Sequence, residues 1–149
     1  MSVNPDLQGR SYPPTQPYAV GREKIREFAA AVKAGHRAHT DLEAARALGH
    51  ADLVAPPTFA VILAQRAEQA VVEDPSSGID FSRVVHADER FTHHRPIVAG
   101  DQLVATATVE TVKSLGGHSM VTTRADIATS AGEPVSTVRS TLLVRGEDA

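Results

Sequence analysis

The spacing of apolar residues predicts helices in the first half of the chain. Between residues 22 and 34, apolar side chains recur at i, i+3, i+4 and i+7, and charged side chains fill most other positions. This pattern indicates an amphipathic helix, which Gly35 is expected to end. A second, short helix is predicted over 41–48, where Thr40 and Glu43 fit a capping box.

A third helical pattern follows two consecutive prolines. Pro56 and Pro57 suit the first turn of a helix, and apolar residues continue at three- and four-residue spacing as far as Glu73. Residues 59–64 are apolar nearly all round, so we expect this helix to be buried at the centre of the molecule. Residues 74–80 are predicted to form a loop.

The second half of the chain alternates apolar and polar residues by twos and is rich in Val, Thr and Ile. The predicted strands are 83–92, 102–114, 118–129 and 134–145, and short turns between them indicate an antiparallel meander. The proline-rich residues 1–20 are expected to form an extended lead-in with one short edge strand. A sheet laid on a buried helix is an α+β architecture, so residues 1–149 are predicted to form a single domain.

Composition excludes several kinds of chemistry. Zero cysteines rule out disulfides, thiolate metal sites and a cysteine nucleophile. A net charge of −3, 4% aromatic residues and no Trp argue against a nucleic-acid groove. No window approaches the roughly 18 apolar residues of a membrane span, and no leader pattern opens the chain, so a cytoplasmic protein is expected. His93 and His94 lack further ligands nearby in sequence, so neither a metal nor another cofactor is predicted.

The order of elements and several motifs resemble the MaoC-like dehydratases, hot-dog proteins that act on (R)-3-hydroxyacyl thioesters of coenzyme A or acyl carrier protein. Residues 95–103 are similar to the family's Pro-Val-x-x-Gly-Asp-x-Leu segment that leads into the sheet, and 132–135 form a similar Gly-Glu-Pro-Val hairpin. The run 20–29 resembles the branch that contains the A and C subunits of the actinobacterial dehydratase. The resemblance implies one hot-dog domain, with a curved antiparallel sheet wrapped around a central helix.

The family's catalytic signature is altered in this chain. Catalytic members carry Gly-Asp-x-Asn-Pro-x-His, and alignment on Gly35 places His36 at the Asp position and Asp41 at the His position. The resemblance therefore makes His36 and Asp41 the candidate acid–base pair, with the two partners exchanged. Exchanging a long ring for a short carboxylate displaces the reactive atoms by about 1 Å, which can cost about a hundredfold in rate. The intervening His39 is expected to be exposed.

The second departure concerns the start of the buried helix. The family's Ala-His-Gly-Met segment offers a backbone N–H to the thioester oxygen. Alignment on Ala55 places Pro56 and Pro57 there, and proline has no N–H to donate. Loss of one such donor typically costs about 100- to 1000-fold in rate. The resemblance assigns Ala55, Pro56, Pro57 and Phe59 to the substrate-binding wall.

Three functional interpretations remain open. In the first, the chain is a catalytically degenerate subunit that binds acyl-ACP or acyl-CoA and completes a site with a catalytic hot-dog partner. In the second, it is a self-sufficient homodimeric (R)-hydratase that uses His36 and Asp41 in exchanged places. In the third, it binds acyl thioesters without converting them. Both dimeric interpretations agree with the exposed strand edge that such a sheet leaves.

Overall fold

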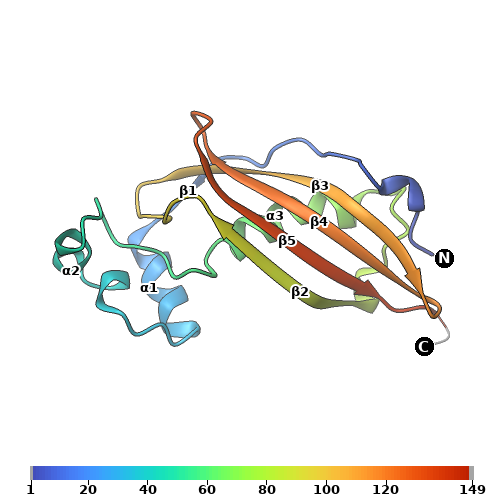
Figure 1. The fold of residues 1–149 in the computed structure, drawn as a ribbon, viewed down its shortest axis with the longest axis horizontal. Coiled ribbons are helices and arrows are strands. Elements are labelled where there is room, and N and C mark those ends of the chain that lie inside the picture. The colour runs from blue at the N-terminus through green and yellow to red at the C-terminus, as the bar shows by residue number, and fades with distance from the viewer. Residues whose placement is uncertain (1, 148–149) are drawn as a thin grey trace.

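A curved antiparallel sheet wraps one central helix in the computed structural model, which describes residues 2–147 (Figure 1). The helices are α1 (Arg22–Ala31), α2 (Leu42–Ala47) and the central α3 (Val61–Glu73), with 3₁₀ turns η1 (Pro5–Leu7), η2 (Arg37–His39) and η3 (Phe81–Arg83). The strands are β1 (Tyr18–Ala19), β2 (Val84–His93), β3 (Gln102–Leu115), β4 (His118–Thr129) and β5 (Pro134–Val144). The predicted α+β class is confirmed, and each predicted strand lies within a residue of its observed bounds.

The strand order corrects one prediction. The sheet runs β1-β3-β4-β5-β2, so only β3, β4 and β5 form a meander, and β2 pairs with β5 at the far edge. The connection between β2 and β3, residues 94–101, is longer than a hairpin loop and carries the chain across the end of the sheet. The extended lead-in and its short edge strand, β1, are found as predicted.

The core lies between α3 and the inner face of the sheet. Alternate residues of the long strands are buried there, as the period of two predicts: Leu103, Ala105, Ala107, Val109, Val121, Ala125, Ile127, Val138 and Leu142. From α3 they meet Leu63, Ala67 and Val71, all nearly inaccessible to solvent. The helix packs chiefly against β3 and β4, while β5 and β2 extend beyond its flank. The helix therefore covers only part of the inner face.

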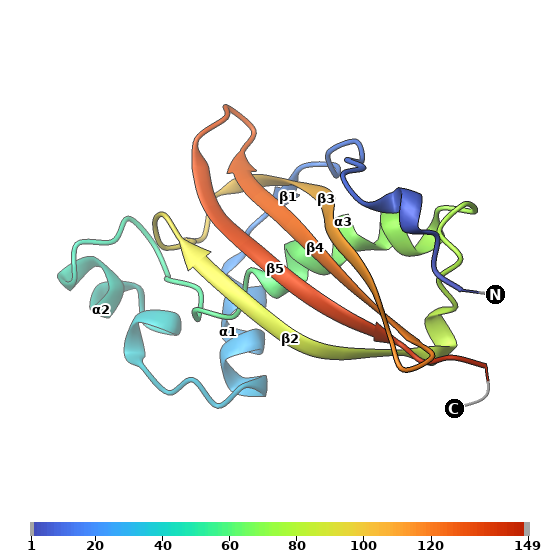
Figure 2. The same ribbon diagram turned by 45° about the vertical axis from the view of Figure 1, so that its right-hand side comes forward.

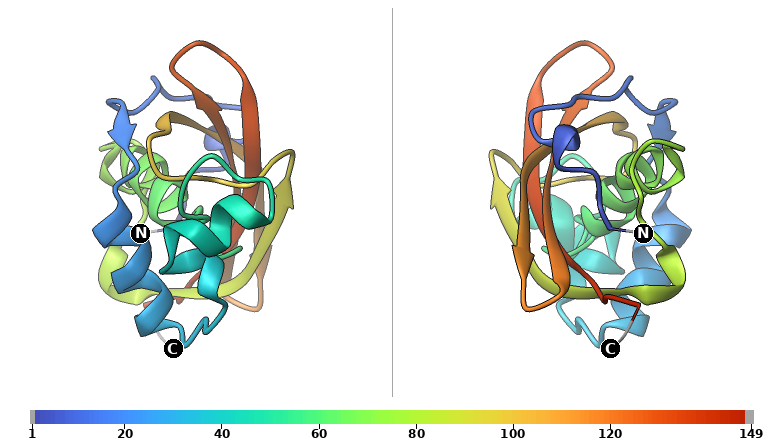
Figure 3. Two further views of the ribbon diagram at one scale, coloured as in Figure 1. Left: turned by 90° about the vertical axis from the view of Figure 1, so that its left-hand side faces the viewer. Right: turned by 90° about the vertical axis from the view of Figure 1, so that its right-hand side faces the viewer.

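The two edges of the sheet differ. The lead-in segment runs along β3, where Tyr12 N–H donates to Ala107 O and Thr15 N–H donates to Ala105 O, both at 2.9 Å. Figure 2 shows this segment passing along one side of the sheet, and Figure 3 shows β2 forming the opposite border. In the described part of the chain, β2 pairs on one side only. Its other edge is free.

Three helix ends differ from prediction. Helix α1 ends at Ala31, before Gly35, because Lys33 adopts a left-handed conformation and Ala34 N–H donates to Ala29 O at 2.8 Å. This arrangement is a Schellman motif, which needs one left-handed residue and finds it in Lys33 instead of glycine.

Asp41, and not Thr40, caps α2. The Asp41 side chain accepts from the backbone N–H of Glu43, whereas Thr40 lies at the end of η2. Helix α3 begins at Val61, four residues after Pro57, because the first turn after the prolines closes through i to i+3 bonds such as Phe59 N–H to Pro56 O.

Candidate functional site

A pocket of about 590 Å³ lies beyond the N-terminal end of α3, where three segments far apart in sequence meet. They are η2 with its preceding residue, the segment before α3, and the end of β2 with the loop that follows. The lining residues are His36, His39, Val54, Ala55, Pro56, Pro57, His93, His94, Arg95, Pro96 and Ile97. The structure thus brings together His36 and most of the predicted substrate-binding wall.

Backbone hydrogen bonds hold these segments in place. Val54 N–H donates to Ala38 O at 3.1 Å, which ties the segment before α3 to η2. Ala55 N–H donates to Ile97 O at 2.8 Å, which ties the same segment to the loop after β2. The N–H of Ala55 is therefore already used inside the protein.

His36 caps η2 through its ring. Its Nδ1 accepts a hydrogen bond of 3.0 Å from Ala38 N–H, and a backbone amide can only donate. The neutral ring must therefore carry its proton on Nε2. His36 is exposed at the pocket and offers this N–H as a donor.

The ring of His39 has the opposite tautomer. Its Nδ1 lies 2.6 Å from Val54 O, and a carbonyl oxygen can only accept, so Nδ1 carries the proton. The Nε2 lone pair of the neutral ring is then an acceptor. His39 is only 9% exposed, which corrects the expectation of an exposed side chain, and the centroids of the two imidazole rings are 6.1 Å apart. The pocket thus holds one imidazole donor beside one imidazole acceptor.

Asp41 is occupied by structural contacts and is not among the residues that line the pocket. Its Oδ2 accepts from Arg37 Nη2 at 2.5 Å, and its Oδ1 accepts from Glu43 N–H at 3.0 Å. The bond from the Arg37 guanidinium holds the pKa of the Asp41 carboxyl below its ordinary value. Asp41 is a helix cap with an ionised carboxylate, a form that accepts hydrogen bonds and donates none.

The two prolines of the predicted substrate-binding wall lie in the turn that leads into α3. Pro56 and Pro57 both line the pocket, and neither has an N–H to offer. Phe59 lies deeper, with no exposed surface, and its ring meets that of Phe28 edge to face with centroids 5.4 Å apart. This contact fixes the start of α3 against α1.

The far wall of the pocket comes from the crossover after β2. Arg95 donates to both carboxylate oxygens of Asp101, at 2.9 and 3.0 Å, and its Nε donates to Glu133 at 2.6 Å. Asp101 Oδ2 also accepts from Val98 N–H at 2.9 Å. This bidentate pair holds the loop that carries Pro96 and Ile97 into the pocket.

The contributions of His39 and of the histidine pair at the end of β2 were not predictable from the sequence. His93 Nδ1 lies 3.0 Å from Ser136 Oγ, and both His93 and His94 line the pocket. No sequence signal places them beside His36, because β2 reaches the pocket only through its pairing with β5. Within residues 2–147, no group of three or more His, Asp and Glu side chains is arranged to hold a metal ion.

A central helix inside a curved antiparallel sheet, with a pocket beyond the helix N-terminus, defines a hot-dog protein. A family model described as the FAS1-like dehydratase domain region matches residues 6–138. A UPF0336 protein of Leifsonia xyli is 61% identical over 146 residues, which are 98% of each chain. A UPF0336 protein of Streptomyces coelicolor is 49% identical over 148 residues, which are 99% of each chain.

Solved structures agree with this assignment. A C-terminally truncated HadBC (3R-hydroxyacyl-ACP dehydratase) complex from Mycobacterium tuberculosis contains a chain with 38% identity and a TM-score of 0.83; the match covers 93% of this chain and 97% of that one. A MaoC-like dehydratase has 35% identity and a TM-score of 0.87, over 95% of this chain and 43% of that one. The chain belongs to the FAS1-like dehydratase region family, and the resemblance to MaoC-like dehydratases is confirmed. None of the helices among the described residues is long and apolar enough to cross a membrane.

Proposed function

We propose that this chain is a hot-dog subunit of a (3R)-hydroxyacyl thioester dehydratase, and that it completes a catalytic site supplied by a partner subunit. In this proposal the partner carries the intact Asp and His. This chain contributes one wall of the active site and binds part of an acyl-CoA or acyl-ACP substrate. Its similarity to a subunit of the HadBC complex, named as a 3R-hydroxyacyl-ACP dehydratase, supports the reaction class.

The observation that carries the proposal is the state of the chain's own pocket. Pro56 and Pro57 line it without an N–H donor, at the position where the family stabilises the developing negative charge. Asp41, the only carboxylate in the altered signature, is bound to Arg37 and to two backbone amides. Both losses fall on the same reaction step, so this proposal expects the chain on its own to be inactive.

The free edge of β2 supports pairing with a second subunit. An unpaired edge strand exposes backbone donors and acceptors that a partner strand can satisfy. Two apolar side chains beside this edge are exposed to solvent: Phe81 at 67% and Val85 at 48%. A partner subunit bound at this edge would shield them from solvent, and the opposite border of the sheet is already covered by the lead-in segment.

Assembly tests the proposal. We expect the chain to form a stable complex, in size-exclusion chromatography with light scattering, with a hot-dog subunit from the same genome that has an intact Gly-Asp-x-Asn-Pro-x-His signature. Val85→Lys should weaken this complex, because it adds a charge at the β2 edge. Leu115→Lys is the matched control, because Leu115 is 65% exposed at the end of β3. A stable homodimer that ignores the candidate subunit would contradict the proposal.

A second candidate is a self-sufficient hydratase in which His39, in place of the predicted Asp41, is the partner of His36. His36 offers a donor and His39 an acceptor at one pocket, which is the minimum set for moving protons at an acyl chain. This candidate predicts hydration of crotonyl-CoA by the purified chain, with the rate lost in both His36→Ala and His39→Ala.

A further inference from the structure

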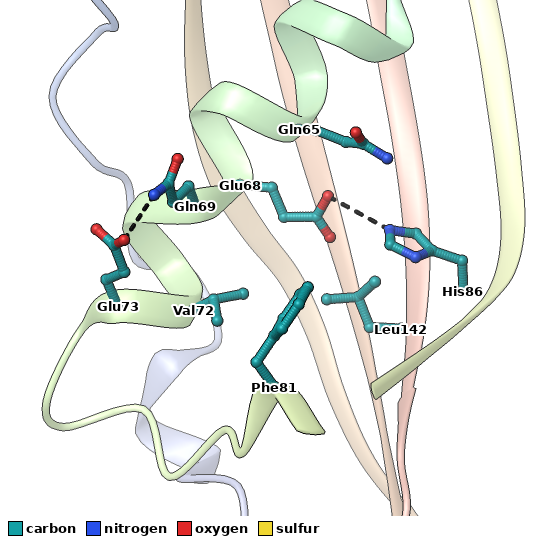
Figure 4. Close-up of a pocket in the computed structure, with 8 residues that line it drawn as sticks. All are labelled: Gln65, Glu68, Gln69, Val72, Glu73, Phe81, His86 and Leu142. Atoms are coloured by element: carbon teal, nitrogen blue, oxygen red, sulfur yellow. Dashed lines mark hydrogen bonds and ion pairs between the residues drawn. The ribbon is translucent and has the colours of Figure 1, made fainter. Parts of the chain in front are cut away.

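A second pocket, of about 430 Å³, lies between α3 and β2, away from the candidate site (Figure 4). One face of α3 lines it at helical spacing: Gln65, Glu68, Gln69, Val72 and Glu73. Phe81, His86 and Leu142 complete the lining from η3, β2 and β5. The pocket exists because β2 and β5 extend beyond the flank of the central helix.

Glu68 is the unusual residue in this pocket. It is only 6% exposed, and its Oε1 has no hydrogen-bond partner among the described residues. Its Oε2 lies 3.9 Å from His86 Nε2, which is too far for a hydrogen bond. Figure 4 shows the two side chains pointing toward each other across the pocket. A buried carboxylate with an unsatisfied oxygen is costly, so it is normally paired with a donor or a cation.

The surroundings of Glu68 are negative. Glu89 on β2 faces the same side of the sheet as His86, because it is paired with the buried Ser140. Its carboxylate accepts a hydrogen bond from Ser140 Oγ at 2.8 Å. Glu73 stands at the rim, where Gln69 donates to it at 2.6 Å. Burial, and then the charge of Glu89, raise the pKa of Glu68 to about 7. Among the described residues that line the pocket, only His86 can carry a positive charge, so the pocket favours a cation.

The pocket also opens beside the free edge of β2. Phe81 lines it and is largely exposed, and His86 lines it from β2 itself, whose other edge is free. A subunit that pairs with β2 would therefore lie beside the mouth of the pocket. An occupant supplied by that subunit would be buried together with Glu68.

We propose that the pocket between α3 and β2 receives a cationic side chain, an arginine or a lysine, from the subunit that pairs with β2. The cation donates to the unpartnered Oε1 of Glu68, and its aliphatic stem packs on Val72, Phe81 and Leu142. This inference rests on the proposed pairing of subunits. It adds the ion pair that sets the register of the interface and selects the partner.

The isolated full-length chain permits a test without the partner. n-Butylguanidinium, n-pentanol and pentanoate have similar apolar tails and cationic, neutral and anionic heads. In a ¹H–¹⁵N chemical-shift titration we expect only n-butylguanidinium to shift the amides of α3 and β2. Glu68→Gln should weaken its binding at least tenfold, whereas Glu73→Gln, a matched loss of charge at the rim, should change it less than twofold. Equal binding of pentanol, or binding that survives Glu68→Gln, would overturn the proposal in favour of an apolar occupant.

The complex gives a second test, in which one substitution should stabilise the isolated chain and weaken the complex. Glu68→Gln should raise the melting temperature of the isolated chain at about pH 8, because it removes an uncompensated buried charge. The same substitution should weaken the complex with the catalytic subunit at least tenfold. A lower melting temperature would show that the carboxylate is already satisfied within the chain, and would overturn the proposal. If no complex forms at all, the proposed function fails, and the titration of the isolated chain still decides the chemistry of the pocket.

Discussion

At the scale of single residues, backbone contacts decide what the histidines of the candidate site can do. Ala38 N–H fixes the acceptor nitrogen of His36, and Val54 O fixes the donor nitrogen of His39. Two residues of the same type, three positions apart, are thereby made chemically different. A substrate in the pocket would meet a hydrogen-bond donor from one ring and an acceptor from the other.

These contacts predict the tautomers. At about pH 8 the imidazole ¹⁵N shifts should place the proton of His36 on Nε2 and the proton of His39 on Nδ1, because the amide N–H and the carbonyl each allow one arrangement only. Resonances assigned with His36→Gln and His39→Gln provide the control. A His39 proton on Nε2 would be incompatible with the contact to Val54.

The carboxylate of Asp101 holds the loop between β2 and β3 in place. Asp101→Ala removes two bonds from Arg95 and one from Val98, and it leaves a partly buried guanidinium without its main partner. We expect a loss of about 2 kcal/mol in the free energy of unfolding, measured with urea.

Glu133 offers the matched comparison. It also binds Arg95, but its side chain is 57% exposed, so Glu133→Ala should cost less than about 1 kcal/mol. Equal losses for the two variants would mean that the bidentate pair does not hold the loop.

At the scale of elements, α3 has two faces with different roles. One face carries Leu63 and Val71 into the core, and the other presents Glu68 to the space beneath β2. The spacing of apolar residues predicts the first face. The second face carries the desolvated carboxyl of Glu68, whose contribution to the free energy of unfolding depends on pH.

The sign of that dependence follows from the raised pKa. The Glu68 carboxyl titrates at about 7 in the folded chain and near its ordinary 4.5 when unfolded, so the folded state holds the proton more tightly. Ionisation of Glu68 therefore does not lower the free energy of unfolding below about pH 4.5. Above pH 7 it lowers the free energy of unfolding by about 3 kcal/mol. Glu68→Gln should thus gain stability over the wild type as pH rises through this range. Glu73→Gln should stay within about 0.5 kcal/mol of the wild type, and parallel curves for all three proteins would refute the assignment.

Element types were predictable from sequence, because the periods of 3.6 and 2 report directly which faces are buried. The helix ends were not, because Lys33 takes a left-handed conformation that residue type disfavours and Asp41 replaces Thr40 as the cap. The place of β2 was not predictable either, since it depends on pairing with β5 across the whole sheet. The burial of His39 depends on Val54, 15 positions away, and only the folded chain brings them together.

At the scale of the whole molecule, the two borders of the sheet differ. The lead-in segment closes the β3 border, whereas β2 is free and lies beside the pocket that holds Glu68. The candidate pocket at the other end of β2 is lined by Pro56 and Pro57, which have no N–H, and Asp41 is bound to Arg37 outside that lining. In the proposed assembly, a single partner subunit pairs with the free edge of β2, supplies the cation for Glu68 and brings the intact Asp and His.

Enzyme activity measured with and without the partner tests this account most directly. The purified chain should hydrate crotonyl-CoA and longer trans-2-enoyl-CoA substrates no faster than buffer. An equimolar mixture with a catalytic subunit that has the intact Asp and His should be active, and His36→Ala in this chain should leave that activity within about threefold. Turnover by the chain alone that is lost in His36→Ala would contradict the account and establish a self-sufficient hydratase.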